Sequence, residues 1–126
     1  MLDAAADAWI LHDFDGVVLE RNHVADEAFG LAEPARRAAG LRAVFHEEDW
    51  PHVAATWARL DEAGPSAYDT RARRADGALA HLSVRSGVVE LAGSRLVLSV
   101  LRDESERVRL EHALRAATRA ASNRRR

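Results

Sequence analysis

Residues 76–114, DGALAHLSVRSGVVELAGSRLVLSVLRDESERVRLEHAL, contain the pattern that decides the fold. The Asp76-Gly77 pair favours a tight hairpin turn, and the apolar and β-branched residues after it predict a strand at 79–89. A turn at 92–94 follows, and then a second strand that reaches residue 101. After residue 102 the apolar spacing changes from two residues to about 3.6, which predicts that the last strand runs directly into a helix.

The point where this strand becomes a helix carries the motif Asp103-Glu104-Ser105-Glu106-Arg107. We expect Asp103 to cap the helix, with Glu106 as its reciprocal partner three residues later. The motif resembles the Asp-Ile-Thr-Glu-Arg sequence that joins the last strand of a PAS domain to its signalling helix. Glu104 stands in place of isoleucine, and Ser105 keeps the hydroxyl of the threonine that it replaces. The resemblance implies that Asp103, Ser105, Glu106 and Arg107 relay a signal into the helix.

The start of the chain resembles the beginning of the same domain. Two short apolar runs surround the turn at 13–16, Asp-Phe-Asp-Gly, and predict a hairpin. Asn22 is the expected N-cap of the next helix, and Gly30 is its expected C-cap. A PAS domain begins with a similar order of strand, Asp-x-Asp-Gly turn, strand and short helix. The resemblance therefore covers roughly residues 8–114.

The middle of the chain is expected to hold short helical pieces and one longer helix. Pro34 and Gly40 break the segment 31–45. The next segment, 46–49, reads His-Glu-Glu-Asp and is similar to the His-Pro-Asp-Asp-like segment of many PAS domains. We expect Asp49 to cap a helix that runs to about residue 63. Its apolar stripe is formed by Trp50, Val53, Trp57 and Leu60.

Together these elements predict an α+β fold. It consists of a five-stranded antiparallel sheet with short helices on one face, as in a PAS domain, and a C-terminal exit helix. The expected divisions are a helical lead-in at 1–8, the domain at 8–103, the exit helix at 104–121 and a frayed tail at 122–126.

Composition excludes several classes of protein. The 126 residues are 48% hydrophobic and 30% charged, which is typical of one soluble globular domain. A net charge of -2 argues against binding to nucleic acid or a membrane surface. The absence of cysteine excludes disulfides, thiolate metal sites and a cysteinyl-flavin photoreceptor. We find no apolar run of about 20 residues and no signal peptide, so we expect a cytoplasmic location.

The resemblance implies a small cavity between the helices and the inner face of the sheet. Pockets of this kind are mostly apolar with a few polar groups. The expected lining residues are His12, Phe29, Phe45, Trp57, Leu60, Tyr68, Thr70, Leu82, Ser99 and Leu101. The face to which His12 points depends on one residue of register. The alternative is a packed core that binds no ligand.

Cofactors and catalysis are both disfavoured. Haem-binding PAS domains place a histidine in the second half of the long helix, where residues 56–61 of this chain contain none. Flavin is disfavoured because the reactive cysteine and an Asn/Gln set on the inner strands are missing. No histidine has a partner at metal-ligand spacing, and no phosphate loop or nucleophile elbow occurs. A small isomerase or hydrolase that uses His12, Asp13 or Asp15 is the less favoured alternative to a non-enzymatic role.

The exit helix and the last strand predict a homodimer. Heptad-like spacing is found for Leu110, Ala113 or Leu114, Ala117, and Ala120 or Ala121. Glu111 is expected to pair with Arg115. The last strand is apolar on both faces, so its outer face requires a cover. By the resemblance, the chain is a sensory domain of a bacterial two-component protein that senses a small ligand and passes the change to an effector module. The alternative is a ligand-free dimerisation module.

Overall fold

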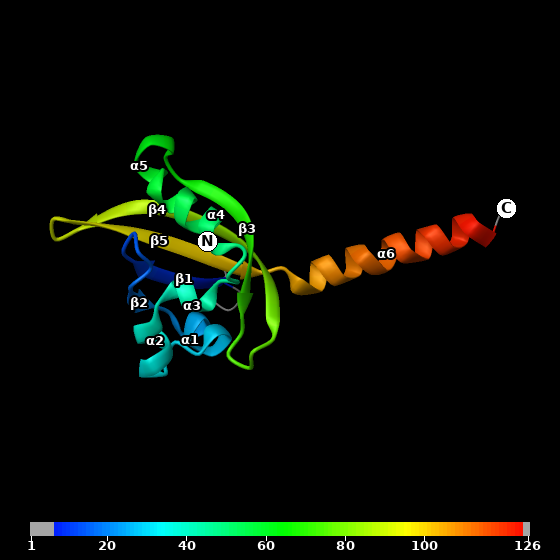
Figure 1. The fold of residues 1–126 in the computed structure, drawn as a ribbon, viewed down its shortest axis with the longest axis horizontal. Helices are drawn as coiled ribbons and strands as arrows, with labels where there is room; N and C mark the ends of the chain where they lie inside the picture. The colour runs from blue at the N-terminus through cyan, green and yellow to red at the C-terminus, as the bar shows by residue number, and fades with distance from the viewer. Residues whose placement is uncertain (1–6, 125–126) are drawn as a thin grey trace.

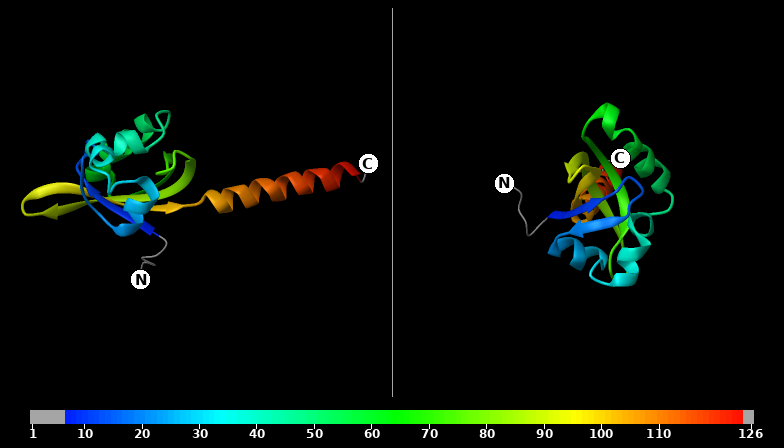
Figure 2. Two further views of the ribbon diagram at one scale, coloured as in Figure 1. Left: turned by 90° about the horizontal axis from the view of Figure 1, so that it is seen from below. Right: turned by 90° about the vertical axis from the view of Figure 1, so that its left-hand side faces the viewer.

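A computed structural model describes residues 7–124. The elements are β1 (Asp7–His12), β2 (Val18–Arg21), α1 (His23–Phe29), α2 (Pro34–Ala39), α3 (Leu41–Val44), α4 (Trp50–Ala58), α5 (Leu60–Ala63), β3 (Ser66–Arg73), β4 (Leu79–Leu91), β5 (Ser94–Asp103) and α6 (Ser105–Arg124). The five strands form one antiparallel sheet in the order β2-β1-β5-β4-β3. Helices α1 to α5 cover one face of the sheet, and α6 projects away from it (Figures 1 and 2). The predicted α+β fold with an exit helix is therefore confirmed.

The sequence of β5 is apolar on both faces because the strand lies in the centre of the sheet. It is hydrogen-bonded to β1 on one side and to β4 on the other. Its inner row is buried under the helices and consists of Val97, Ser99 and Leu101. Its outer row is partly buried and consists of Leu96, Leu98 and Val100. The strand therefore has one side chain row in the core and another on the helix-free face of the sheet.

Helix α1 begins and ends as its sequence predicts. The side chain of Asn22 accepts a hydrogen bond from the backbone N–H of Ala25. Gly30 ends the helix in the left-handed conformation with φ 70°, which a residue without Cβ adopts at little cost. Asn22 also accepts from the backbone N–H of Trp9 and donates to the carbonyl of Asp7. One side chain thus caps α1 and holds it to β1.

The expected single helix from Asp49 to residue 63 is wrong in two respects. α4 ends at Ala58 and α5 begins at Leu60, because the backbone of Arg59 turns at φ -101° and ψ 0°. Asp49 occupies the N-cap position of α4 but makes no side-chain capping bond. Its carboxylate instead binds Arg71 of β3, with an Nη2–Oδ1 distance of 2.8 Å. A two-pronged, charge-assisted contact outcompetes a bond to a neutral backbone N–H.

Two expectations at the chain ends also change. Asp7 and Ala8 belong to β1 and not to a lead-in helix, whose other residues lie outside the described part of the chain. At the other end, α6 extends to Arg124, so residues 122–124 are helical and not frayed. Within residues 7–124 no helix is long and apolar enough to cross a membrane.

Candidate functional site

The residues predicted to line a pocket come together between the helices and the inner face of the sheet. All of them are buried except Tyr68, which is partly buried. The open question of register is settled for His12, whose side chain points inward and is 0% exposed. The bulge between Leu11 and His12 lies on the β2 side, so the alternation with β5 is undisturbed.

A continuous series of hydrogen bonds, which we call the core chain, joins five of the inward-facing side chains. The Nε1–H of Trp57 donates to the hydroxyl oxygen of Tyr68 at 2.8 Å. The hydroxyls of Tyr68 and Ser86 are 2.8 Å apart, and those of Ser86 and Ser99 are 2.7 Å apart. Ser99 contacts Nε2 of His12 at 2.8 Å. The core chain therefore crosses α4, β3, β4, β5 and β1 in one line.

Ser86 is the member of the core chain that the sequence analysis missed. Its inward position follows from the alternation of β4, in which Leu82 and Val84 face the core two and four residues earlier. A serine in a buried row of a strand requires a hydrogen-bonding partner, since an unpaired buried hydroxyl destabilises the folded state. The alternation of β4 is therefore the feature of the sequence from which the inward position of Ser86 could have been predicted.

Aromatic rings fill the space beside the core chain. The ring of His12 lies 4.3 Å from the ring of Trp57, centroid to centroid. Phe45 and Trp50 approach the same indole edge-on, at 6.0 and 5.4 Å. Among the described residues, every buried side-chain nitrogen or oxygen has a hydrogen-bonding partner. The polar groups of the core chain thus satisfy one another, Thr70 bonds to Asp49, and aromatic side chains lie beside the core chain.

Burial keeps both titratable members of the core chain neutral. Desolvation lowers the pKa of His12 to about 4, against the opposing effects of the backbone carbonyl and the charge of Asp13. Desolvation also raises the pKa of Tyr68, although its hydrogen bonds to Ser86 and Trp57 act in the other direction. At neutral pH the core chain therefore contains no charge.

A separate cavity of about 300 Å³ lies where α6 leaves the sheet. Its lining is more polar than the core, and it includes two residues of the expected pocket, Thr70 and Leu82. The lining residues are Asp49, Asp69, Thr70, Arg71, His81, Leu82, Glu104, Arg107 and Val108. The hydrogen bonds from Arg71 lower the pKa of Asp49 to about 2, so this ion pair persists over a wide pH range.

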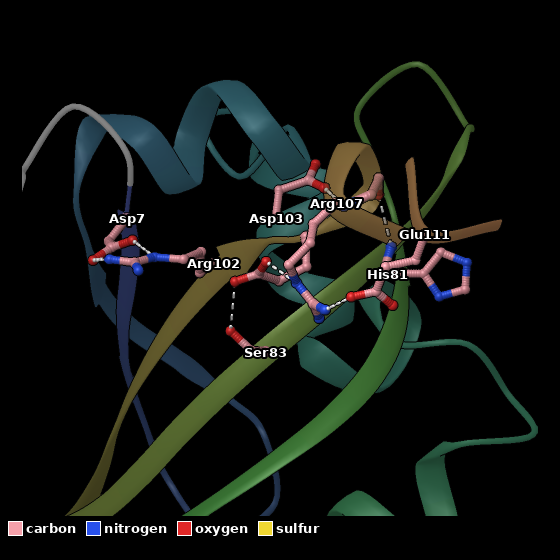
Figure 3. A network of polar contacts seen from close by, with 9 residues as sticks. Asp7, His81, Ser83, Arg102, Asp103, Arg107 and Glu111 are labelled. Atoms are coloured by element: carbon pink, nitrogen blue, oxygen red, sulfur yellow. Dashed lines mark hydrogen bonds and ion pairs between the residues drawn. The ribbon is translucent and has the colours of Figure 1, made fainter. Parts of the chain in front are cut away.

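The predicted relay residues lie at this junction between β5 and α6 (Figure 3). Asp103 accepts hydrogen bonds from the backbone N–H of Ser105 at 2.9 Å and from Arg74 at 2.7 Å. The backbone N–H of Glu104 donates to the carbonyl of His81, and the N–H of His81 donates to the hydroxyl of Ser105. The first residues after β5 are thereby held to the beginning of β4 and, through Arg74, to the β3–β4 hairpin.

The helix start differs from the expected capping box. α6 begins at Ser105, one residue later than expected, because Glu104 is bonded to β4. Asp103 still accepts the N–H of Ser105, whereas Glu106 is exposed and is not its reciprocal partner. Burial by itself would raise the pKa of Asp103, but the hydrogen bonds from Ser105 and Arg74 outweigh it and leave the pKa below its usual value.

Arg107 takes the pairing role that was expected of Arg115. Its guanidinium lies between Glu104, at 2.8 Å, and Glu111, so the expected pair of Glu111 with Arg115 is wrong (Figure 3). Glu104 in turn accepts from the hydroxyl of Ser83 on β4. The first turn of α6 is thus connected through Arg107 and Glu104 to the sheet.

The opposite face of the sheet, which the helices leave uncovered, carries an apolar patch. We call it the outer face, and it consists of Trp9, Leu11, Leu96, Leu98 and Val100. Trp9 is 37% exposed. An ion pair of Asp7 with Arg102, at 2.8 Å, borders the patch, and its hydrogen bonds hold the pKa of Asp7 below the usual value (Figure 3).

Among residues 7–124 no group of three or more His, Asp or Glu side chains is arranged to hold a metal ion. No family model matches the chain, and no curated protein matches it in sequence. Solved structures, however, match it closely in fold. A PAS domain from Colwellia psychrerythraea superimposes with a TM-score of 0.69 at 14% identity, over 79% of this chain and 87% of that one.

Two further solved structures agree. The PAS domain of an HTR-like protein from Haloarcula marismortui has a TM-score of 0.67 at 20% identity, over 77% of this chain and 80% of that one. A domain of a sensory box sensor histidine kinase/response regulator from Geobacter sulfurreducens has a TM-score of 0.62 at 20% identity, over 77% and 82%. The resemblance inferred from the two ends of the sequence is therefore confirmed: this chain has the PAS fold.

Proposed function

We propose that the chain is a PAS-type sensory module of a bacterial signal-transduction protein and that it passes a change in the sheet into α6. The observation that carries this proposal is the junction, where β5 continues into α6 and the connecting residues are bonded to β4. A displacement of β5 relative to β4 would alter these bonds, because they join the residues that follow β5 to β4. Asp103, Ser105 and Arg107 are the relay residues, whereas Glu106 has no contact that supports such a role.

The contacts of the junction suit a reversible relay. Arg107 is 57% exposed and pairs with the partly exposed Glu104 and Glu111, and an ion pair that water reaches in this way contributes little to stability. Such pairs exchange partners at low cost, whereas the apolar interior has one dense packing. A relay of this kind has two arrangements, one with Glu104 and Ser105 bonded to β4 and one with these bonds released.

We also propose that α6 pairs with the same helix of a second copy. Helix α6 extends over Ser105–Arg124 and has no buried residue. Leu110 and Leu114 are 56% and 67% exposed, and a helix in a protein gains most of its stability from the packing of its apolar side chains, which α6 lacks in the single chain. Parallel pairing places the two leucines against their counterparts and brings the outer faces of the two sheets close together.

Because the polar groups of the core chain bond to one another, we favour a signal that arrives at the outer face over a ligand bound in the interior. The function that we prefer is therefore that of a dimeric module that responds to changes at its interface. The second candidate, a small-ligand sensor, is supported by the cavity at the junction, which adjoins the relay residues. The Geobacter protein is described as a sensor histidine kinase/response regulator, and we propose a comparable cytoplasmic effector context here. We assign the chain no catalytic reaction.

Light scattering tests the dimer and its interface together. We expect a dimer for the wild type and a monomer for Leu114→Asp, because a charge at that position disrupts helix pairing. Leu91→Asp is the matched control: Leu91 is 50% exposed at the β4–β5 hairpin, away from α6, and its replacement should leave the dimer intact. A monomeric wild type at high concentration, or a dimeric Leu114→Asp variant, would contradict the proposed pairing.

A further inference from the structure

The two ends of the core chain have fixed hydrogen-bonding roles. At one end, the indole N–H of Trp57 can only donate. At the other end, Nδ1 of His12 lies 2.7 Å from the carbonyl oxygen of Asp13, which can only accept. Nδ1 must therefore carry the proton of the neutral imidazole. It follows that Nε2 of His12 is an acceptor.

The roles of the ends determine the orientation of every hydroxyl between them. Because Nε2 of His12 accepts, Ser99 donates to it at 2.8 Å. Ser86 then donates to Ser99, and Tyr68 donates to Ser86 while it accepts from Trp57. All the links of the core chain thus donate in one direction, from α4 toward β1, and no alternative arrangement of the neutral groups satisfies both ends.

We propose that His12 is a proton-binding switch, in which a proton on Nε2 reverses the direction of the core chain and leaves the hydroxyl hydrogen of Tyr68 without an acceptor in it. Protonated Nε2 must donate to Ser99, so Ser99 and Ser86 each have to turn and donate toward Tyr68. The Tyr68 oxygen then receives hydrogen bonds from both Ser86 and Trp57, and its own hydrogen has no acceptor in the core chain. A buried hydroxyl hydrogen without an acceptor is unfavourable, and because Tyr68 as a residue is partly exposed, we expect it to shift so that this hydrogen reaches water.

Charged and titratable groups of β1, β3, α3 and α4 lie around the core chain. Asp13, its neighbour at the end of β1, acts on it through its charge and its backbone carbonyl. Tyr68 of β3 is the other titratable member of the core chain, and His52 of α4 faces it with ring centroids 6.4 Å apart. Arg42 of α3 lies over Trp50, one ring further from the switch. Burial is the dominant influence and lowers the pKa of His12 to about 4, so the switch responds to acid and is at rest at neutral pH.

This inference concerns the folded domain alone and does not rest on the proposed relay or on dimerisation. Its first test is the imidazole ¹⁵N spectrum of the wild-type protein at neutral pH. We expect His12 in the Nδ1–H tautomer, which is the less common one for free histidine. An Nε2–H tautomer would overturn the assigned direction of the core chain, and with it the switch.

The second test is an acid titration followed by the NMR signal of the Trp57 indole N–H. We expect this signal to shift with a midpoint near pH 4 while the dispersed amide signals of the sheet persist. His12→Gln, which cannot bind the proton, should remove the shift, and the matched variant His52→Gln should retain it. A shift that survives in His12→Gln, or a wild-type indole signal that stays constant until the sheet unfolds, would refute the switch.

Discussion

The buried His12 predicts a loss of stability in weak acid. In the folded protein its pKa is about 4, whereas the ordinary value that the unfolded chain adopts is 6.5. The unfolded chain therefore binds the proton more tightly than the folded one. The stability that comes from a neutral His12 is fully present above pH 6.5 and is lost as the pH falls toward 4.

The size of the effect follows from the two pKa values. We expect the free energy of unfolding to fall by about 2 kcal/mol between pH 7 and pH 5 and by about 3 kcal/mol at pH 4. The carboxylates with lowered pKa values act in a separate window. Asp49, with a pKa of about 2, contributes stability that is present above its unfolded value of 3.8 and is lost as the pH falls through 2. The two causes can therefore be separated by pH.

Urea unfolding followed by far-UV circular dichroism at several pH values measures this loss. The matched variant His12→Gln should be less stable at pH 7 but should lack the decrease between pH 6.5 and 4, so the difference from the wild type narrows as the pH falls. If this difference stays constant over the whole range, protonation of His12 is not linked to folding and the reasoning is refuted.

Three further predictions concern single contacts. Asp103→Ala should lower the helicity of α6 in circular dichroism and reduce the free energy of unfolding by about 1 kcal/mol, because the first N–H of the helix loses its acceptor. The matched change Glu106→Ala at an exposed position should have no effect, and equal losses of helicity in the two variants would argue against a capping role for Asp103. Asp49→Asn should cost about 1 to 2 kcal/mol in urea unfolding at pH 7 by weakening the pair with Arg71, and a cost that persists below pH 2 would point to another cause. Trp57→Phe should cost about 1 to 3 kcal/mol and raise the mobility of β3 in hydrogen exchange, because it removes the donor that begins the core chain; unchanged exchange in β3 would argue against that role.

The sequence predicted those parts of the fold that depend on local periodicity and capping. Asn22 and Gly30 delimit α1 as expected, since each acts on backbone groups within four residues. The alternation of β5 separated its side chains into two rows, and the structure shows that the row with Ser99 faces the interior and the row with Leu98 faces outward. These rules need no knowledge of the rest of the molecule, which is why they succeeded for α1 and for the alternation of β5.

The contacts that could not be predicted join residues far apart in the chain. Asp49 satisfies the local rule for an N-cap, but an arginine 22 residues later takes its carboxylate. His12 meets a serine 87 residues away, and the orientation of its ring depends on a register that one residue could change. The core chain forms only because the fold brings side chains of four strands and one helix into contact. Local sequence patterns do not predict which side chains of distant elements will be in contact.

The proposed relay passes a structural change in the core to α6. It is tested most directly by measuring the distance between spin labels on α6 in the two protomers. The chain has no native cysteine, so Ala116→Cys, next to the proposed pairing stripe and not on it, provides a single site for a spin label on α6. We predict a well-defined distance between the labels in the dimer, and a different distance when Ser99→Ala interrupts the core chain four residues before Asp103. The absence of any interprotomer distance, or the same distance in both proteins, would contradict a relay from β5 through the junction into α6.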